Sequence, residues 1–344
     1  MCSSTRRRTD GGPSVVGAVY DRGYRGYEGE RGGRRAARWA LFRASVRRAL
    51  GIRRPWRQKV APAALLAIAT VPAIVFVGVG YVTRDSIASD FEWITYREYV
   101  GVSSYLLVFV ALTAPDIMCP DRRQRVLPVL FARPLTGVDY VVAKVGAMFA
   151  LLFAFSFLPQ VVLFLGQMLV SDDGALRYAR DNAEVIWQVP IAVSMLALYY
   201  ASIGIAVASL ASRRIIAGAS IIGLLLVSGI VSSVLVGPET TTSQPTTISP
   251  PSTIVTEDGE VIVVPSGDEN VFRDPVVEQE PSSAALLNLL TLPLVLRDLV
   301  FEGEVLDSPL SGIENGGLYA VLVYVGVVLV ALVVLLRRYD EVER

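Results

Sequence analysis

The chain has 344 residues, 53% of them hydrophobic, and 32 Lys and Arg balance 32 Asp and Glu. A mean hydropathy of +0.50 is typical of a protein whose main solvent is lipid. The chain contains no histidine and only two cysteines. This excludes active sites and metal centres that depend on histidine, and it leaves too few cysteines for a disulfide framework.

The N-terminal region is strongly basic. Sixteen of the cations precede Val60, and no uninterrupted apolar run of a secretory signal occurs there. We therefore expect residues 1–33 to form a disordered basic arm that stays in the cytoplasm. Residues 34–58 contain RRAARWALFRASVRRAL, in which arginines surround one apolar helical face. That face consists of Trp39, Phe42, Val46 and Leu50.

This pattern in residues 34–58 predicts an amphipathic helix that lies in the plane of the membrane, against the anionic lipid of the inner leaflet. The alternatives are a solvated basic arm and a nucleic-acid-binding segment. The helix leads directly into an apolar run and alternates aromatic with basic residues. We therefore expect membrane lipid, and not nucleic acid, to be its partner.

Six apolar segments predict transmembrane helices, because a helix needs about 20 apolar residues to cross a bilayer. The segments are 60–82, 98–118, 139–170, 184–211, 215–236 and 316–336. We expect Pro115 to end or kink the second helix and Pro159 to bend the third. The connection at 212–214 is so short that the fourth and fifth helices must form a tight hairpin. The fold class is thus an all-α polytopic membrane protein with five helices in 60–236, a sixth at 316–336 and a tail at 337–344.

The segment 237–315 differs in character from the spans that flank it. It begins with a Thr-, Ser- and Pro-rich stretch, and Asp258-Gly259 lies between two β-prone runs, which predicts a β-hairpin. A shorter apolar patch follows at 283–301 and contains Pro293. We interpret this patch as an interfacial or re-entrant helix, with a seventh span as the alternative.

The orientation follows from the distribution of charge. If the N-terminus is inside, the cytoplasmic segments hold 26 of the 32 Lys and Arg residues but only 10 of the 32 acids. The zero net charge is therefore a cancellation between +16 inside and −16 outside. Since cations accumulate in cytoplasmic loops, both termini are predicted to be cytoplasmic, in the plasma membrane.

The predicted cytoplasmic connection at 121–136 combines charge with an apolar run. Its apolar residues are Val126, Leu127, Val129, Leu130 and Phe131, and charged residues flank them. This pattern predicts a short amphipathic element that presents a surface to a cytoplasmic partner. The alternative is an ordinary loop whose positive charges only fix the topology.

This connection resembles that of the membrane permease subunits of ATP-binding-cassette exporters of the ABC-2 type. The residues that carry the resemblance are Asp121-Arg122-Arg123, the run from Val126 to Phe131, Pro134-Leu135-Thr136, and Lys144. Gly137 stands where the family often has arginine, and Asp121 where glutamate is commoner. In outline the resemblance covers the whole chain: an N-terminal helix, six spans, and apolar structure before the last span.

The resemblance implies that 121–136 is a coupling element that docks on a separate ATPase subunit. That subunit would bind ATP and Mg²⁺, and the usual assembly pairs two permeases, identical or homologous, with two ATPases. The coupling residues would be Asp121, Arg122, Arg123, Val126, Leu127, Val129, Leu130, Phe131, Pro134 and Thr136. This chain has no P-loop, G-x-x-x-x-G-K-[ST], so we expect neither enzymatic activity nor a cofactor in the chain itself.

Polar residues within the apolar spans are candidates for a transport pathway, with helix packing as the alternative role. They are Gln160, Gln167, Gln188, Tyr199 and Tyr200. We expect no charge at mid-membrane, because Lys144 lies near the inner end of its helix and can extend to the interface. This argues against a secondary carrier or channel, which is the second hypothesis; a non-transporting membrane scaffold is the third.

Overall fold

The computed structural model describes residues 32–52, 57–83, 95–100, 103–124, 130, 135–171, 174–237, 240–241, 252–255, 261–264, 277–278, 282–305 and 308–343. The first helices in chain order are α1 (Gly33–Ala49), α2 (Arg57–Thr83), α3 (Tyr96–Val100), α4 (Ser103–Arg123) and α6 (Gly137–Val170). Next come α7 (Ala175–Asp181), α8 (Val185–Leu210), α9 (Arg214–Val236), the 3₁₀ helix η2 (Ser283–Leu287), α10 (Leu292–Phe301) and α11 (Gly316–Glu343). Four short strands lie between α9 and η2, namely β1 (Thr240–Thr241), β2 (Ser252–Val255), β3 (Val261–Val264) and β4 (Val277–Glu278).

Six helices of the described chain are long and apolar enough to cross a membrane. They cover Pro62–Val82, Tyr96–Arg123, Gly137–Val170, Val185–Leu210, Arg214–Val236 and Gly316–Asp340. Each coincides with one of the six predicted segments, so the prediction of six helices long and apolar enough to cross a membrane is confirmed.

Two helices extend beyond their predicted ends. α4 continues through Pro115 and Pro120 to Arg123, so Pro115 does not end this helix, and of the two predicted effects only a kink is left. α11 continues past Arg337 to Glu343. The predicted ends were placed where apolar residues give way to charged ones, but arginine, lysine and glutamate are good helix formers and do not end a helix.

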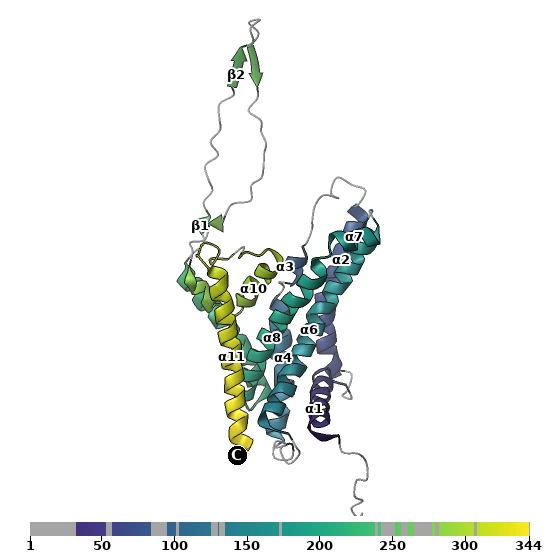
Figure 1. The fold of residues 1–344 in the computed structure, drawn as a ribbon, viewed down its shortest axis with the longest axis vertical. Helices are drawn as coiled ribbons and strands as arrows, with labels where there is room; N and C mark the ends of the chain where they lie inside the picture. The colour runs from purple at the N-terminus through teal and green to yellow at the C-terminus, as the bar shows by residue number, and fades with distance from the viewer. Residues whose placement is uncertain are drawn as a thin grey trace, which may run out of the picture.

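The long helices pack around α8. This helix contacts α4, α6, α9, α10 and α11, and α2 packs mainly on α6. Figure 1 shows α11 on one side of the bundle and α2 on the other, with α4, α6 and α8 between them. A close approach of α4 and α8 depends on Gly204, where a Cβ atom would lie 2.5 Å from Val110 Cγ1. The centre of the bundle is therefore built by α4, α6 and α8.

The two ends of the bundle carry different elements. Figure 1 shows α1 and the C-terminal end of α11 at one end, which we call the α1 end. Helices α3, α7 and α10 lie at the opposite end, which we call the α10 end.

The segment between α9 and α11 contains the elements predicted for it. β2 pairs antiparallel with β3, with Val255 opposite Val261, so the two strands flank the turn predicted at Asp258-Gly259. α10 has ten residues and is therefore about 15 Å long, which is too short for a seventh span. It packs on α8 and α11, with Pro293 in its first turn.

A buried ion cluster fixes α10 at the α10 end. Asp298 Oδ1 accepts hydrogen bonds from Arg97 Nε of α3 at 2.8 Å and from Arg297 Nη2 at 2.6 Å. Arg297 Nη1 also donates to the carbonyl oxygen of Arg97 at 3.1 Å. The cluster joins two short helices that are some 200 residues apart in sequence.

Candidate functional site

The α1 end collects the elements that flank the predicted coupling connection. The last turn of α4 leads into that connection, and the first turn of α6 follows it. α1 packs on both helices, and α11 contacts α6. The residues that hold these elements together define the candidate site.

A buried ion pair joins α4 to α6. Asp121, in the last turn of α4, has its Oδ2 atom 2.5 Å from Lys144 Nζ of α6. Tyr140 donates its hydroxyl to the same Oδ2 at 3.0 Å, and Lys144 Nζ donates to the carbonyl oxygen of Ile117 at 3.0 Å. Asp121 is 3% exposed and Lys144 is 1% exposed. The expectation that Lys144 extends to the interface is wrong, because its ammonium group has partners inside the bundle.

The same carboxylate also binds α1. Arg48 Nη1 lies 2.5 Å from Asp121 Oδ1, so α1 holds one oxygen of Asp121 while α6 holds the other. Two cations and a phenol around one carboxylate satisfy a charge that would otherwise be costly to bury. Asp121 is thus a junction of α1, α4 and α6.

A second carboxylate ties the start of α6 to the start of α1. Thr136 is the N-cap of α6 and forms a capping box with Asp139, in which each side chain accepts from the other's backbone N–H. Asp139 also accepts hydrogen bonds from Arg34 Nε and from Arg38 Nη1, and Arg34 Nη2 donates to Thr136 Oγ1 at 3.0 Å. The residue that begins α6 is therefore held by α1.

Two arginines link α4 to the α8–α9 turn. Arg122 Nη1 donates to the carbonyl oxygens of Ser209 at 2.6 Å and Ala211 at 3.2 Å, which lack helical donors at the end of α8. Arg214, at the start of α9, forms an ion pair with Asp116 at 2.8 Å. These contacts extend the junction to a fourth and a fifth helix.

The predicted coupling residues fall into three groups. Asp121, Arg122 and Arg123 belong to the last turn of α4 and not to a separate element, and Arg123 is exposed. Thr136 caps α6, and Leu130 is half-buried against the core. The remaining predicted residues lie outside the described residues: Val126, Leu127, Val129, Phe131 and Pro134.

α1 contacts the bundle through a mixed face. Trp39 is 58% exposed and Leu50 is 37% exposed, whereas Phe42 and Val46 are half-buried. The buried centre of this helix is Ser45, at 1% exposure, and Arg34, Arg38 and Arg48 reach Asp139 and Asp121. Contact of the apolar face with lipid stays a prediction.

α1 also lies beside α6. Phe42 lies over Gly146, one turn or more beyond the contact between Arg34 and Asp139. In Figure 1, α1 extends along the bundle beside α6. The two carboxylates thus hold α1 on the bundle, and its position in the plane of a membrane stays a prediction.

The candidate pathway residues do not converge on one cavity. Tyr199 and Tyr200 are fully buried, and Tyr199 stacks on Tyr324 of α11 at 5.3 Å between ring centres. Tyr200 donates to the carbonyl oxygen of Leu290 at 2.7 Å, and Gln188 Nε2 donates to that of Phe301 at 3.4 Å. These three residues pack α8 against α11 and the segment around α10.

The two remaining candidates lie on α6. Gln167 is half-buried beside Gly80 of α2, and Gln160 is 2% exposed. Neither contacts the tyrosines of α8 in the described bonds and ring contacts. The five residues are therefore spread over separate helix contacts.

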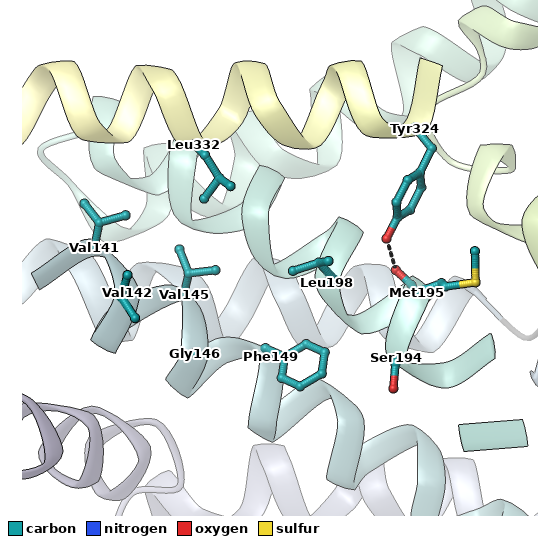
Figure 2. Close-up of a pocket in the computed structure, with 10 residues that line it drawn as sticks. All are labelled: Val141, Val142, Val145, Gly146, Phe149, Ser194, Met195, Leu198, Tyr324 and Leu332. Atoms are coloured by element: carbon teal, nitrogen blue, oxygen red, sulfur yellow. Dashed lines mark hydrogen bonds between the residues drawn. The ribbon is translucent and has the colours of Figure 1, made fainter. Parts of the chain in front are cut away.

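A groove beside α8 has no predicted pathway residue in its walls. Figure 2 shows this groove, of about 460 Å³, between α6, α8 and α11. Valines and Phe149 of α6 face Leu198 of α8 and Leu332 of α11. Tyr324 turns its hydroxyl to the carbonyl oxygen of Met195 at 2.9 Å, as the dashed line in Figure 2 marks. The groove is thus almost wholly apolar.

Most contacts of the junction were not predicted from the sequence. Asp139, Tyr140, Arg34, Arg38 and Arg48 were not predicted to form buried contacts, although charged residues inside or beside apolar spans are a general signal of buried pairs. A search for an Asp at the end of one span and a Lys near the start of the next would have proposed the pair of Asp121 and Lys144.

The described residues contain no group of three metal-ligating side chains. No known protein family, no curated protein and no solved structure matches this chain, so its function must be inferred from these residues.

Proposed function

We propose that this chain is the transmembrane permease subunit of an ATP-binding-cassette transporter, an exporter of the plasma membrane driven by ATP hydrolysis on a separate subunit. The α1 end then faces the cytoplasm, where the 121–136 connection contacts the ATPase. Two permeases and two ATPases form the assembly. ATP and Mg²⁺ bind to the partner and not to this chain.

The observation that carries the proposal is the junction around Asp121. Both helices that bracket the 121–136 connection are joined to each other by a buried ion pair and to α1 by the arginines that bind the buried carboxylates of Asp121 and Asp139. A force applied to the connection would move α4, α6 and α1 as one body, because a buried ion pair is costly to separate. Coupling by rigid-body movement requires such a unit.

The distribution of charge favours this function over a secondary carrier or channel. Asp116, Asp121, Asp139 and Lys144 all lie within about two turns of a helix end at the α1 end. Residues 145–170 of α6 and all of α8 contain no charged residue. Carriers driven by protons or sodium ions usually need ionisable groups deeper in the membrane.

Co-purification tests the proposal. A tagged chain is expressed in its native host, which supplies the host's own ATPase subunits, and is purified in mild detergent. We expect an ATP-binding-cassette ATPase to co-purify, and the Val129→Asp and Phe131→Asp double variant to lose it while still inserting in the membrane. Leu176→Asp is the matched control, because Leu176 is 89% exposed on α7 at the α10 end and should leave the complex intact.

Three outcomes would contradict the proposal. Purification of the chain alone, with no ATPase, would exclude a coupling role, and ATP-independent flux in liposomes would favour a carrier. Unchanged co-purification of the double variant would show that the connection is not the contact. Substrate-dependent ATP hydrolysis by the reconstituted complex would exclude a mere scaffold.

The orientation is tested separately. In a variant without Cys2 and Cys119, single cysteines at Arg177 and Arg213 report the two ends of the bundle. We expect a membrane-impermeant maleimide added to intact cells to label position 177 and not position 213. The reverse result would place the α1 end outside.

A further inference from the structure

A second, smaller cavity lies between α6 and α8, toward the α10 end. Its volume is about 230 Å³, and its walls include Phe157 and Phe164 of α6 with Val189 and Pro190 of α8. Among the described residues that line it, Gln160 carries the one polar side chain. Leu165 and Ile186, which also line it, are 48% and 56% exposed, so the cavity opens on the outer surface of the bundle.

Gln160 lacks hydrogen-bond partners within the described part of the chain. The residue is 2% exposed, and its buried Oε1 atom accepts no hydrogen bond. Gln188, by contrast, donates to a backbone carbonyl oxygen. A buried amide without partners is costly, and such groups in native proteins usually bind something.

A proline interrupts the hydrogen bonds of α8 beside the cavity. Pro190 has no N–H group, so it cannot donate to the carbonyl oxygen of Ile186 one turn earlier. Ile186, Pro190 and Gln160 all line the cavity. The wall therefore combines apolar surface with one amide side chain, the usual composition of a small-molecule site.

We propose that this cavity binds a small neutral amphiphile from the surrounding bilayer, with its hydroxyl or amide group on Gln160 and its apolar body against Phe157 and Phe164. The ligand is neutral because none of the described residues that line the cavity carries a charge to balance an ion. It is smaller than a typical drug, because the cavity lies below the usual range of pocket volumes. The site does not depend on the proposed transport function.

The test uses 3-azioctanol, a photoreactive medium-chain alcohol, with the full chain in phosphatidylcholine nanodiscs. Adducts formed on illumination are mapped by peptide mass spectrometry. We expect them on residues 157–165 or 185–190. Octan-1-ol should compete about fivefold better than octane, which lacks the hydroxyl, because one hydrogen bond contributes about that factor.

Two glutamines on α6 give a matched pair of variants. Gln160→Leu should lower the adduct yield about fivefold, the contribution of one hydrogen bond. Gln167→Leu should leave it unchanged, because Gln167 lies two turns further along the same helix and does not line the cavity. Size-exclusion elution reports whether each variant folds.

Val161→Phe provides a second test that keeps Gln160 in place. Val161 lines the cavity and is half-buried, so a phenyl ring there fills the space and should also lower the yield. Normal labelling of a folded Gln160→Leu or Val161→Phe variant would overturn the proposal. Adducts spread evenly over α2 and α9 would show partition into lipid alone and would overturn it too.

Discussion

Removal of one partner from the Asp121–Lys144 pair tests how the α1 end is held together. Asp121 accepts hydrogen bonds from Lys144, Tyr140 and Arg48. Lys144 has one other described acceptor, the carbonyl oxygen of Ile117. Removal of Asp121 therefore leaves Lys144 without a counter-charge, whereas removal of Lys144 leaves Asp121 with two of its three partners.

The expected loss of stability follows from this difference. Asp121→Asn leaves the buried ammonium group of Lys144 without a counter-charge, which should lower the free energy of unfolding by about 3–5 kcal/mol. Lys144→Met leaves Asp121 with Arg48 and Tyr140, so the loss should be smaller, about 1–3 kcal/mol. In the double variant Asp121→Asn, Lys144→Met, no ammonium group is left unpaired inside the bundle. Its loss should therefore be smaller than the sum of the two single losses by about 2 kcal/mol.

The assay is titration of the purified chain with sodium dodecyl sulfate in mild detergent, followed by tryptophan fluorescence. The exposed pair of Arg177 and Asp181 is the control, with side chains 68% and 61% exposed. Asp181→Asn should change the free energy of unfolding by about 0.5 kcal/mol or less, since exposed ion pairs contribute little.

The result that would refute this reasoning is additivity. If the double variant loses the full sum of the single losses, Asp121 and Lys144 do not interact in the folded protein. A loss below about 1 kcal/mol for Asp121→Asn would likewise show that Lys144 reaches water.

Two further predictions concern helix contacts, measured by the same titration. Gly218→Ala should cost about 1–3 kcal/mol, because its Cβ atom would lie 2.9 Å from the backbone oxygen of Ala111. Gly223→Ala, on the same helix with open space around it, should cost nothing, and an equal loss would contradict the packing of α9 on α4. Arg122→Met should cost about 1.5–3 kcal/mol through its bonds to the end of α8, whereas Arg123→Met, at an exposed neighbour, should be neutral. Equal effects of these two substitutions would show that Arg122 does not hold the α8–α9 turn.

The transmembrane helices could be predicted because hydropathy is a local sum. Any run of about 20 apolar residues forms a helix in lipid, whatever its neighbours are. The ends of α4 and α11 were less predictable, because a helix ends where its hydrogen bonds end and not where its hydrophobicity does. In α4 the extra turn is held by Asp121 and Arg122, whose partners lie on other helices.

The partners of the charged residues were not predictable in the same way. Lys144 was expected to extend toward the membrane interface, a reasonable inference for a single helix near a boundary. It turns inward because Asp121 of a neighbouring helix offers a carboxylate at the same depth. Which side of a helix faces its neighbour depends on packing, and no pattern within α6 alone specifies it.

The sequence by itself determined the six apolar helices, the asymmetry of charge between their connections and the absence of histidine chemistry. Each of these is a property of single residues or of short windows. Only the tertiary structure decided that one carboxylate joins α1, α4 and α6, that α1 packs by a mixed face, and that the Oε1 atom of Gln160 accepts no hydrogen bond from the described part of the chain. The physical reason is that pairing depends on the rotation and depth of helices that are far apart in sequence, and these are set by the packing of the whole bundle.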